Sequence, residues 1–153
     1  MNSSIVSIVT SRGDEKLVVW GGRSSPGCCS NDVITFEGGE WGVMATEGSK
    51  PRGRHRHTCD VISNRMWVVG GKCEGNFSGE SPVFSLDLEE RKWREESQLG
   101  EFPRIHSHSS CVDGGKLVVS GGVCCDVTIE NEFAVWEVDT EEKSCKKFVF
   151  LYL

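Results

Sequence analysis

Short apolar stretches, each followed by a pair of glycines, recur three times along the chain. The stretches cover residues 16–20, 65–69 and 116–120, and the glycine pairs are Gly21-Gly22, Gly70-Gly71 and Gly121-Gly122. They are rich in Val and Leu and too short for most helices, which is typical of buried strands that end at a turn. No stretch has apolar residues at the 3.6-residue spacing of an amphipathic helix. The pattern therefore predicts an all-β protein.

The recurrence has a regular period. Gly70 follows Gly21 by 49 residues, and Gly121 follows Gly70 by 51. Trp93 follows Trp41 by 52 residues, and one more step of 52 reaches a cysteine. Pro51-Arg52 and Pro103-Arg104 share that spacing. Each unit of about 50 residues contains about four short strand patterns, and an array of four-stranded units predicts β-propeller blades.

These marks resemble those of the kelch repeat, and the resemblance covers essentially the whole chain. Besides the glycine pairs and the tryptophans, an Asn-Asp-x-x-x-aromatic strand pattern occurs in Asn31-Asp32-Val-Ile-Thr-Phe36 and, with Glu for Asp, in Asn131-Glu132-Phe-Ala-Val-Trp136. The resemblance implies a kelch-type β-propeller segment of three four-stranded antiparallel blades. We place the blades at residues 1–49, 50–101 and 102–153 of a single kelch-repeat region.

Both kinds of repeat mark have a structural interpretation. The glycine pairs lie where the chain must turn tightly near the crowded centre of a ring, at positions that need φ > 0 or exclude a side chain. Trp41, Trp93 and their counterpart Cys145 occupy one position of the repeat, and we expect Trp41 and Trp93 to fill the wedge between neighbouring blades.

Three blades do not close a propeller, because closed rings have about 4–8 blades. Stacked repeats bury their apolar faces only against neighbouring repeats, and uncovered sheet edges promote aggregation. We therefore expect the ring to be incomplete. Three explanations stay open: a fragment of a longer ring, a truncated gene product, or one half of a six-bladed dimer that self-associates.

Charge and cysteine content narrow the class of protein. The 153 residues hold 17 Lys and Arg against 23 Asp and Glu, a net charge of −6, which disfavours general binding to nucleic acid or anionic membranes. No apolar run approaches the ~20 residues of a membrane span, and the N-terminus does not match an export signal. We expect a cytoplasmic protein without membrane association, whose eight cysteines are reduced thiols.

The cysteines fall into two groups. Cys59, Cys111 and Cys145 lie in apolar or alternating stretches and are expected to be small buried side chains. The others follow the double glycines in loops, where variable loop filling, a redox role and metal capture all stay open. This second group is Cys28, Cys29, Cys73, Cys124 and Cys125.

Four basic residues cluster in the stretch 50–57 of this acidic chain. Strand alternation would place Arg54 and Arg56 on one side and His55 and His57 on the other. The links between blades and the loops after the double glycines emerge on one face, where Arg forks suit an acidic or phosphate-bearing partner. A structural role and a solvated rim are the alternatives. The candidate binding residues are Lys50, Arg52, Arg54, His55, Arg56, His57, Arg104, His106 and His108.

The four histidines form two equivalent pairs. His55 and His106 lie 15 residues before their double glycines, and His57 and His108 lie 13 residues before them. This repetition favours a structural hydrogen bond in every blade. A metal site that uses both pairs is the alternative, although we predict no metal and no cofactor.

No motif of a known catalytic site occurs, so we expect a non-catalytic scaffold that binds other proteins. The alternative comes from a second resemblance. Residues 17–26, 54–59 and 103–111 resemble the kelch region of tRNA wybutosine-synthesising methyltransferases, which use S-adenosylmethionine. That resemblance implies that methyl transfer occurs in a separate domain and that no catalytic residue lies here. The stretch 50–57 would then face tRNA.

Overall fold

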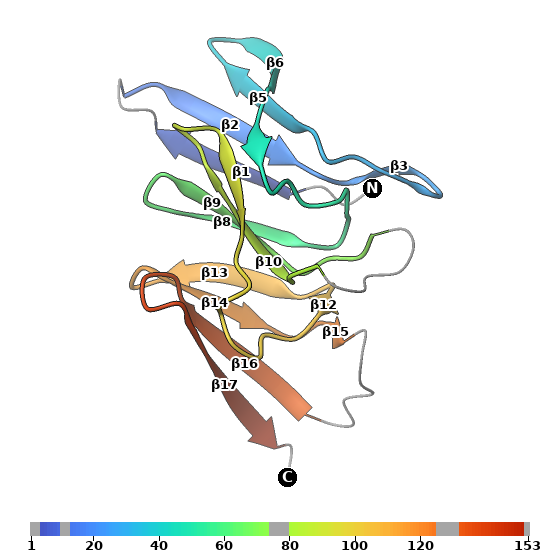
Figure 1. Ribbon diagram of the computed structural model, residues 1–153, viewed down its shortest axis with the longest axis vertical. Helices are drawn as coiled ribbons and strands as arrows, with labels where there is room; N and C mark the ends of the chain where they lie inside the picture. Colours follow the sequence, from blue (N-terminus) through green and yellow to red (C-terminus); the bar gives the residue numbers. More distant parts are fainter. Residues whose placement is uncertain (1–3, 10–12, 74–79, 125–131, 152–153) are drawn as a thin grey trace.

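A computed structural model describes residues 4–9, 13–73, 80–124 and 132–151 as an all-β structure. Figure 1 shows the sheets stacked along the long axis, with the N-terminal sheet at the top and the C-terminal sheet at the bottom. The first sheet has the order β1-β2-β5-β6. Its strands are β1 (Ser4–Val9), β2 (Glu15–Trp20), β5 (Val33–Glu37) and β6 (Glu40–Met44).

The second and third sheets repeat this antiparallel arrangement. The second contains β8 (Thr58–Ile62), β9 (Arg65–Val69), β10 (Val83–Asp87) and β11 (Lys92–Glu95), and β7 (Glu47–Gly48) joins it parallel to β11. The third is made of β13 (Ser109–Asp113), β14 (Lys116–Ser120), β16 (Glu132–Asp139) and β17 (Ser144–Leu151). The described residues also form two short two-stranded sheets. One pairs β3 (Arg23–Ser25) with β4 (Cys28–Cys29), and the other pairs β12 (Ile105–His106) with β15 (Val123–Cys124). The predicted partial propeller is confirmed.

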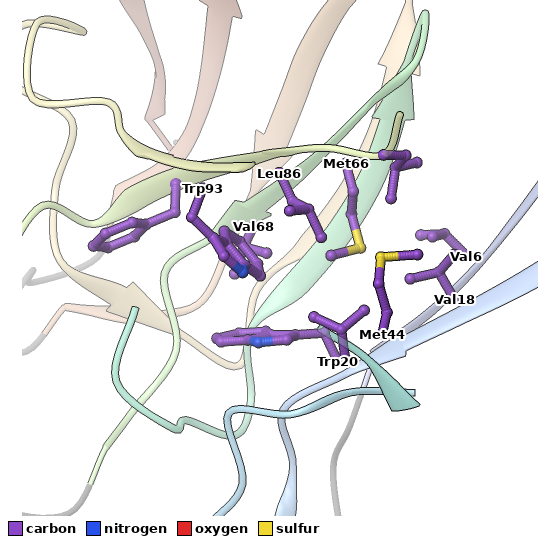
Figure 2. Close-up of a cluster of buried hydrophobic side chains, with 11 residues drawn as sticks. Val6, Val18, Trp20, Met44, Met66, Val68, Leu86 and Trp93 are labelled. Atoms are coloured by element: carbon purple, nitrogen blue, oxygen red, sulfur yellow. The ribbon is translucent and has the colours of Figure 1, made fainter. Parts of the chain in front are cut away.

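Two apolar cores lie between consecutive sheets. Because side chains alternate along a strand, each sheet presents one face to the sheet before it and the other to the sheet after it. Figure 2 shows the first core, where Trp20 of the first sheet lies against Trp93 of the second, with 5.5 Å between ring centroids. The second core joins Trp67 and Val69 of the second sheet to Leu117 and Trp136 of the third.

One ion pair recurs at the same place in every sheet. A base at the start of the second long strand pairs in register with an acid at the end of the third. The three pairs are Lys16–Glu37 (3.0 Å), Arg65–Asp87 (2.9 Å) and Lys116–Asp139 (3.4 Å). These pairs define which positions of the three sheets are equivalent.

The third sheet is offset from the equivalence that the Asn-Asp pattern suggests. Phe36 directly precedes Glu37, and Val138 directly precedes Asp139. Val138 is therefore the counterpart of Phe36 in the strand pairing, and Trp136 lies two residues earlier. The reason lies in the length of the connection. Asp139 follows Gly122 by 17 residues, whereas Glu37 follows Gly22 by 15, so the motif is displaced by two residues relative to the strand pairing.

The tryptophan position behaves differently in the first and second sheets. Trp41, Trp93 and Cys145 pair with Phe36, Leu86 and Val138, so they are structurally equivalent. Trp93 is 1% exposed between the first two sheets, whereas Trp41 is 62% exposed. The prediction that Trp41 fills a wedge between blades is therefore wrong for this structure. This position faces the preceding sheet, and no described sheet covers that side of the first one.

The double-glycine turns require glycine for two separate reasons. All six residues have φ between +60° and +98°, in the region that L-residues with side chains rarely adopt. At Gly70 space is also absent, because a Cβ there would lie 2.2 Å from the carbonyl oxygen of Ile105 in the next link. The turn of one blade is thus packed against the chain that enters the next.

No helix among the described residues is long and apolar enough to cross a membrane.

Candidate ligand-binding face

The stretch that carries most of the predicted binding residues is a link between sheets and not a strand. Within residues 50–57 only His55 makes a β-bridge, to Lys72, and Arg56 has φ = +59°. A left-handed residue reverses the alternation of side chains, so the prediction that Arg54 and Arg56 share one side is wrong. Arg54, His55 and His57 are buried and Arg56 is exposed. The equivalent Ser107, between His106 and His108, has φ = +58°.

Arg54 is part of the interior. Its side chain is fully buried, with Nη1 donating to the carbonyl oxygen of Gly70 and Nη2 donating to Glu80 Oε2, both at 3.0 Å. The guanidinium also lies over the ring of Phe84 at 5.2 Å. Burial lowers the pKa of Arg54, and the charge of Glu80 opposes that effect. These contacts leave Arg54 a structural residue that fixes the link against the second double glycine.

His57 and His108 also point into the interior, each against the double-glycine turn of the preceding sheet. The ring of His57 makes an edge contact with Trp20, and a Cβ at Gly21 would lie 2.7 Å from its Cε1. His108 Nε2 lies 3.0 Å from Thr58 Oγ1. A Cβ at Gly70 would lie 2.7 Å from His108 Cε1.

Burial is the largest effect on both of these rings. It lowers the pKa of each imidazole to about 4, and the positive charge of Arg54 contributes at His57. A hydrogen bond to the backbone of Trp20 opposes this effect at His57, and one to the backbone of Val69 opposes it at His108. Trp20 and Val69 both directly precede a double glycine, so the two histidines have equivalent surroundings. The structural hydrogen bond in every blade stays a prediction.

Several cationic or titratable side chains remain at the surface of the links. Three of them lie on segments that are hydrogen-bonded to one another, and we call these three, Arg56, Lys72 and His106, the link rim. Arg56 and Lys72 are exposed and His106 is half-buried. Backbone hydrogen bonds join the segments that carry them: Ser107 N donates to the oxygen of Arg56 at 2.9 Å, and His55 and Lys72 exchange bonds of 2.9 and 2.8 Å. The rim is therefore held by ordered backbone.

The charges of the link rim act on one another. Burial is the first cause of a lowered pKa at His106, followed by the charges of Lys72 and Arg56. The rim therefore places the guanidinium of Arg56 and the ammonium of Lys72 beside an imidazole whose charged form is disfavoured. Such a set can hold a carboxylate or a phosphate, with the guanidinium of Arg56 as the bidentate donor.

The other predicted residues lie along the same links. Lys50 and Arg52 are exposed, the backbone N–H of Arg52 donates to Glu80 Oε1 at 3.0 Å, and Arg104 is half-buried. Sequence reasoning missed Lys72. The sequence clue to Lys72 was its position directly after Gly70-Gly71. In the structure the β-bridge to His55 brings it beside the link.

The loop cysteines among the described residues lie on this face and form no disulfide, and Cys125 lies outside those residues. Cys29 Sγ lies 3.4 Å from His55 Nδ1. Cys28 is exposed and Cys73 is buried. Within the described part of the chain, no three His, Cys, Asp or Glu residues are grouped as a metal site would need.

One prediction about the strand cysteines is wrong. Cys111 is exposed, because it lies on the side of β13 that faces away from the second sheet. Cys59 and Cys145 are half-buried and pack against the two cores.

Sheets of four antiparallel strands that stack face to face and are joined by links at one end define propeller-type blades. The family comparison agrees with this class. Residues 3–149 match the family model described as the KLHDC2/KLHL20/DRC7 Kelch-repeats domain. The chain belongs to the kelch-repeat family.

Similar proteins include members with different names. Kelch-like protein 15 of Danio rerio is 35% identical over 98 residues, which are 59% of this chain and 15% of that protein. Adagio-like protein 1 of Oryza sativa subsp. japonica is 35% identical over 118 residues, 72% of this chain and 18% of that protein. The tRNA wybutosine-synthesizing protein 2/3/4 of Arabidopsis thaliana is 31% identical over 93 residues, which are 60% of this chain and 9% of that protein. The chain spans less than a fifth of each.

Proposed function

We propose that this chain is a protein-binding module whose link rim holds an acidic or phosphate-bearing segment of its partner. The observation that carries the proposal is the grouping of Arg56, Lys72 and His106 on hydrogen-bonded links of a chain whose net charge is −6. Local cations on an acidic protein favour an anionic segment at that place and repel anions elsewhere. Kelch repeats commonly serve in protein–protein interaction, which supports this reading.

Arg56 is the residue through which the proposal is best tested. It is exposed, so replacing it leaves both apolar cores intact. Arg91 is a matched control, because it is an exposed arginine with a similar φ of +56° in the turn between β10 and β11. That turn lies at the opposite end of the sheet from the links, since successive hairpins alternate ends.

The experiment measures binding of a short fluorescein-labelled peptide that contains Glu and phosphoserine, by fluorescence anisotropy at low and at physiological salt. Arg56→Gln should weaken binding about tenfold, the effect of one charge-assisted hydrogen bond. Arg91→Gln should leave the affinity unchanged. Equal losses in the two variants, or no binding at low salt, would contradict the proposal.

The second candidate is that the same rim faces tRNA and the chain belongs to a longer tRNA-modifying methyltransferase. The similarity to the Arabidopsis protein named for wybutosine synthesis favours it. A gel shift with total tRNA over a salt series tests it, because phosphate contacts give a steep salt dependence. Arg56→Gln should reduce that slope, whereas a tRNA that does not bind at low salt would exclude this candidate.

A further inference from the structure

Among the described residues, nothing covers one side of the first sheet, and this side is almost entirely apolar. Two rows of side chains in register cross all four strands on this side: Ile5–Val19–Ile34–Val43 and Ser7–Leu17–Phe36–Trp41. We call the seven apolar members of these rows the proximal face. Trp41 is 62% exposed and Val43 is 74% exposed. Contiguous exposed apolar surface of this kind marks an interaction site.

The second sheet shows what the equivalent surface does when it is covered. Through the repeated ion pair, Phe36 corresponds to Leu86, and Trp41 corresponds to Trp93. Leu86 and Trp93 are almost fully buried against the first sheet. The proximal face is thus the first copy of a surface that, in the second and third sheets, contacts the preceding sheet. Its fitting partner is the opposite side of another blade.

The third sheet has such an opposite side, which no other described sheet covers and which we call the distal face. Phe133 pairs with Phe150 and Val135 pairs with Phe148, on the side away from the second core. The three phenylalanines are 38–56% exposed. Val135 corresponds to Val33 and Val83, which are fully buried at the two observed interfaces.

A charged pair on the distal face does not prevent docking. Lys116 and Asp139 lie at the equivalent of Arg65 and Asp87, and the latter pair lies on the side of the second sheet that contacts the third. The observed interface between the second and third sheets therefore already accommodates this ion pair. Glu137 also lies on the distal face, where the second sheet has Ser85, and it pairs with Lys116 at 2.9 Å. The apolar positions of the two uncovered faces otherwise correspond to those that meet inside the chain.

We infer that the proximal face of one chain binds the distal face of a second copy, and that the second copy returns the same contact. Two copies of three sheets make six, within the 4–8 blades that closed propellers contain. A head-to-tail contact that closes in this way buries both faces of both copies and leaves no apolar sheet exposed. The occupant is a blade of a second copy, and neither face includes a residue of the link rim.

The first test is the mass of the purified chain by sedimentation equilibrium over a range of concentrations. The chain has a mass of 16.9 kDa, and we expect a dimer of twice that mass. Val43→Glu should weaken the dimer at least about 30-fold, as buried interface anchors do. Val123→Glu is the matched control, since Val123 is 55% exposed on β15 outside both faces. Circular dichroism checks that each variant keeps its strands.

The second test identifies the two faces. Phe148→Glu alters only the distal face and should also produce monomers. Mixing the Val43→Glu and Phe148→Glu chains should restore a dimer, because the mixed pair keeps one unaltered contact. A wild-type monomer at every concentration, equal effects of Val43→Glu and Val123→Glu, or a dimer insensitive to Phe148→Glu would each overturn the inference.

Discussion

Acid should destabilise this fold through His57 and His108. Both imidazoles are buried against the turns of the preceding sheets, and burial lowers the pKa of each to about 4. In the unfolded chain these groups have the ordinary histidine pKa near 6.5. Between pH 6.5 and 4 the unfolded state binds more protons than the folded state, so stability falls as the pH falls. Above pH 7 the effect is absent, because both states are neutral.

The magnitude follows from the two pKa values. At pH 5 an unfolded histidine is almost fully protonated, whereas a folded one with a pKa of about 4 is mostly neutral. The linkage relation then gives a loss of about 2 kcal/mol for each histidine, or about 4 kcal/mol for both. This is a large part of the ~5–15 kcal/mol by which domains are stable.

The assay is urea unfolding at pH 7.5, 6 and 5, followed by tryptophan fluorescence. His57→Gln removes one buried imidazole, so its loss of stability between pH 7.5 and 5 should be smaller than that of the wild type by about 2 kcal/mol. His108→Gln should behave alike. His106→Gln is the control, since this half-buried ring should change the pH slope less. A His57→Gln, His108→Gln double variant with the wild-type slope would refute the reasoning.

Two further substitutions test the contacts that hold the links in place. Gly70→Ala and Gly114→Ala both force an alanine into a left-handed position, but only Gly70 has the Ile105 oxygen 2.2 Å from the new Cβ. Thermal unfolding should therefore show a loss of about 1 kcal/mol for Gly114→Ala and a clearly larger one for Gly70→Ala. Arg54→Ala removes the positive charge that pairs with Glu80 and should cost about 3–5 kcal/mol in chemical denaturation. Equal losses in the glycine pair, or a fully stable Arg54→Ala, would contradict these assignments.

The repeat architecture could be read from the chain because each of its marks depends on local chemistry. A glycine pair after a strand requires φ > 0 wherever it occurs, and Gly70 and Gly71 adopt φ of +60° and +97°. The spacing of 52 residues between Trp41 and Trp93 correctly identified equivalent positions. The alternation of apolar and polar side chains and the repeat period were therefore enough to predict the strands, their arrangement in blades and the family.

The candidate site was only partly predictable. The sequence pointed to the stretch 50–57 but sorted its side chains by strand alternation, which Arg56 breaks by adopting a left-handed conformation. No local pattern indicated that Arg54 would be buried with Glu80, 26 residues away in the chain. Lys72 was missed because its place in the link rim depends on a bridge to His55.

The chain by itself determined where strands begin, where they turn and which residues repeat, since these follow from side-chain alternation and backbone freedom within a few residues. Only the tertiary structure decided which repeated residues are covered. Trp41 and Trp93 occupy the same position of the same motif, yet one is exposed and the other is buried. Burial is a property of two surfaces, so it depends on whether another sheet lies against the residue, and the motif alone does not contain that neighbour.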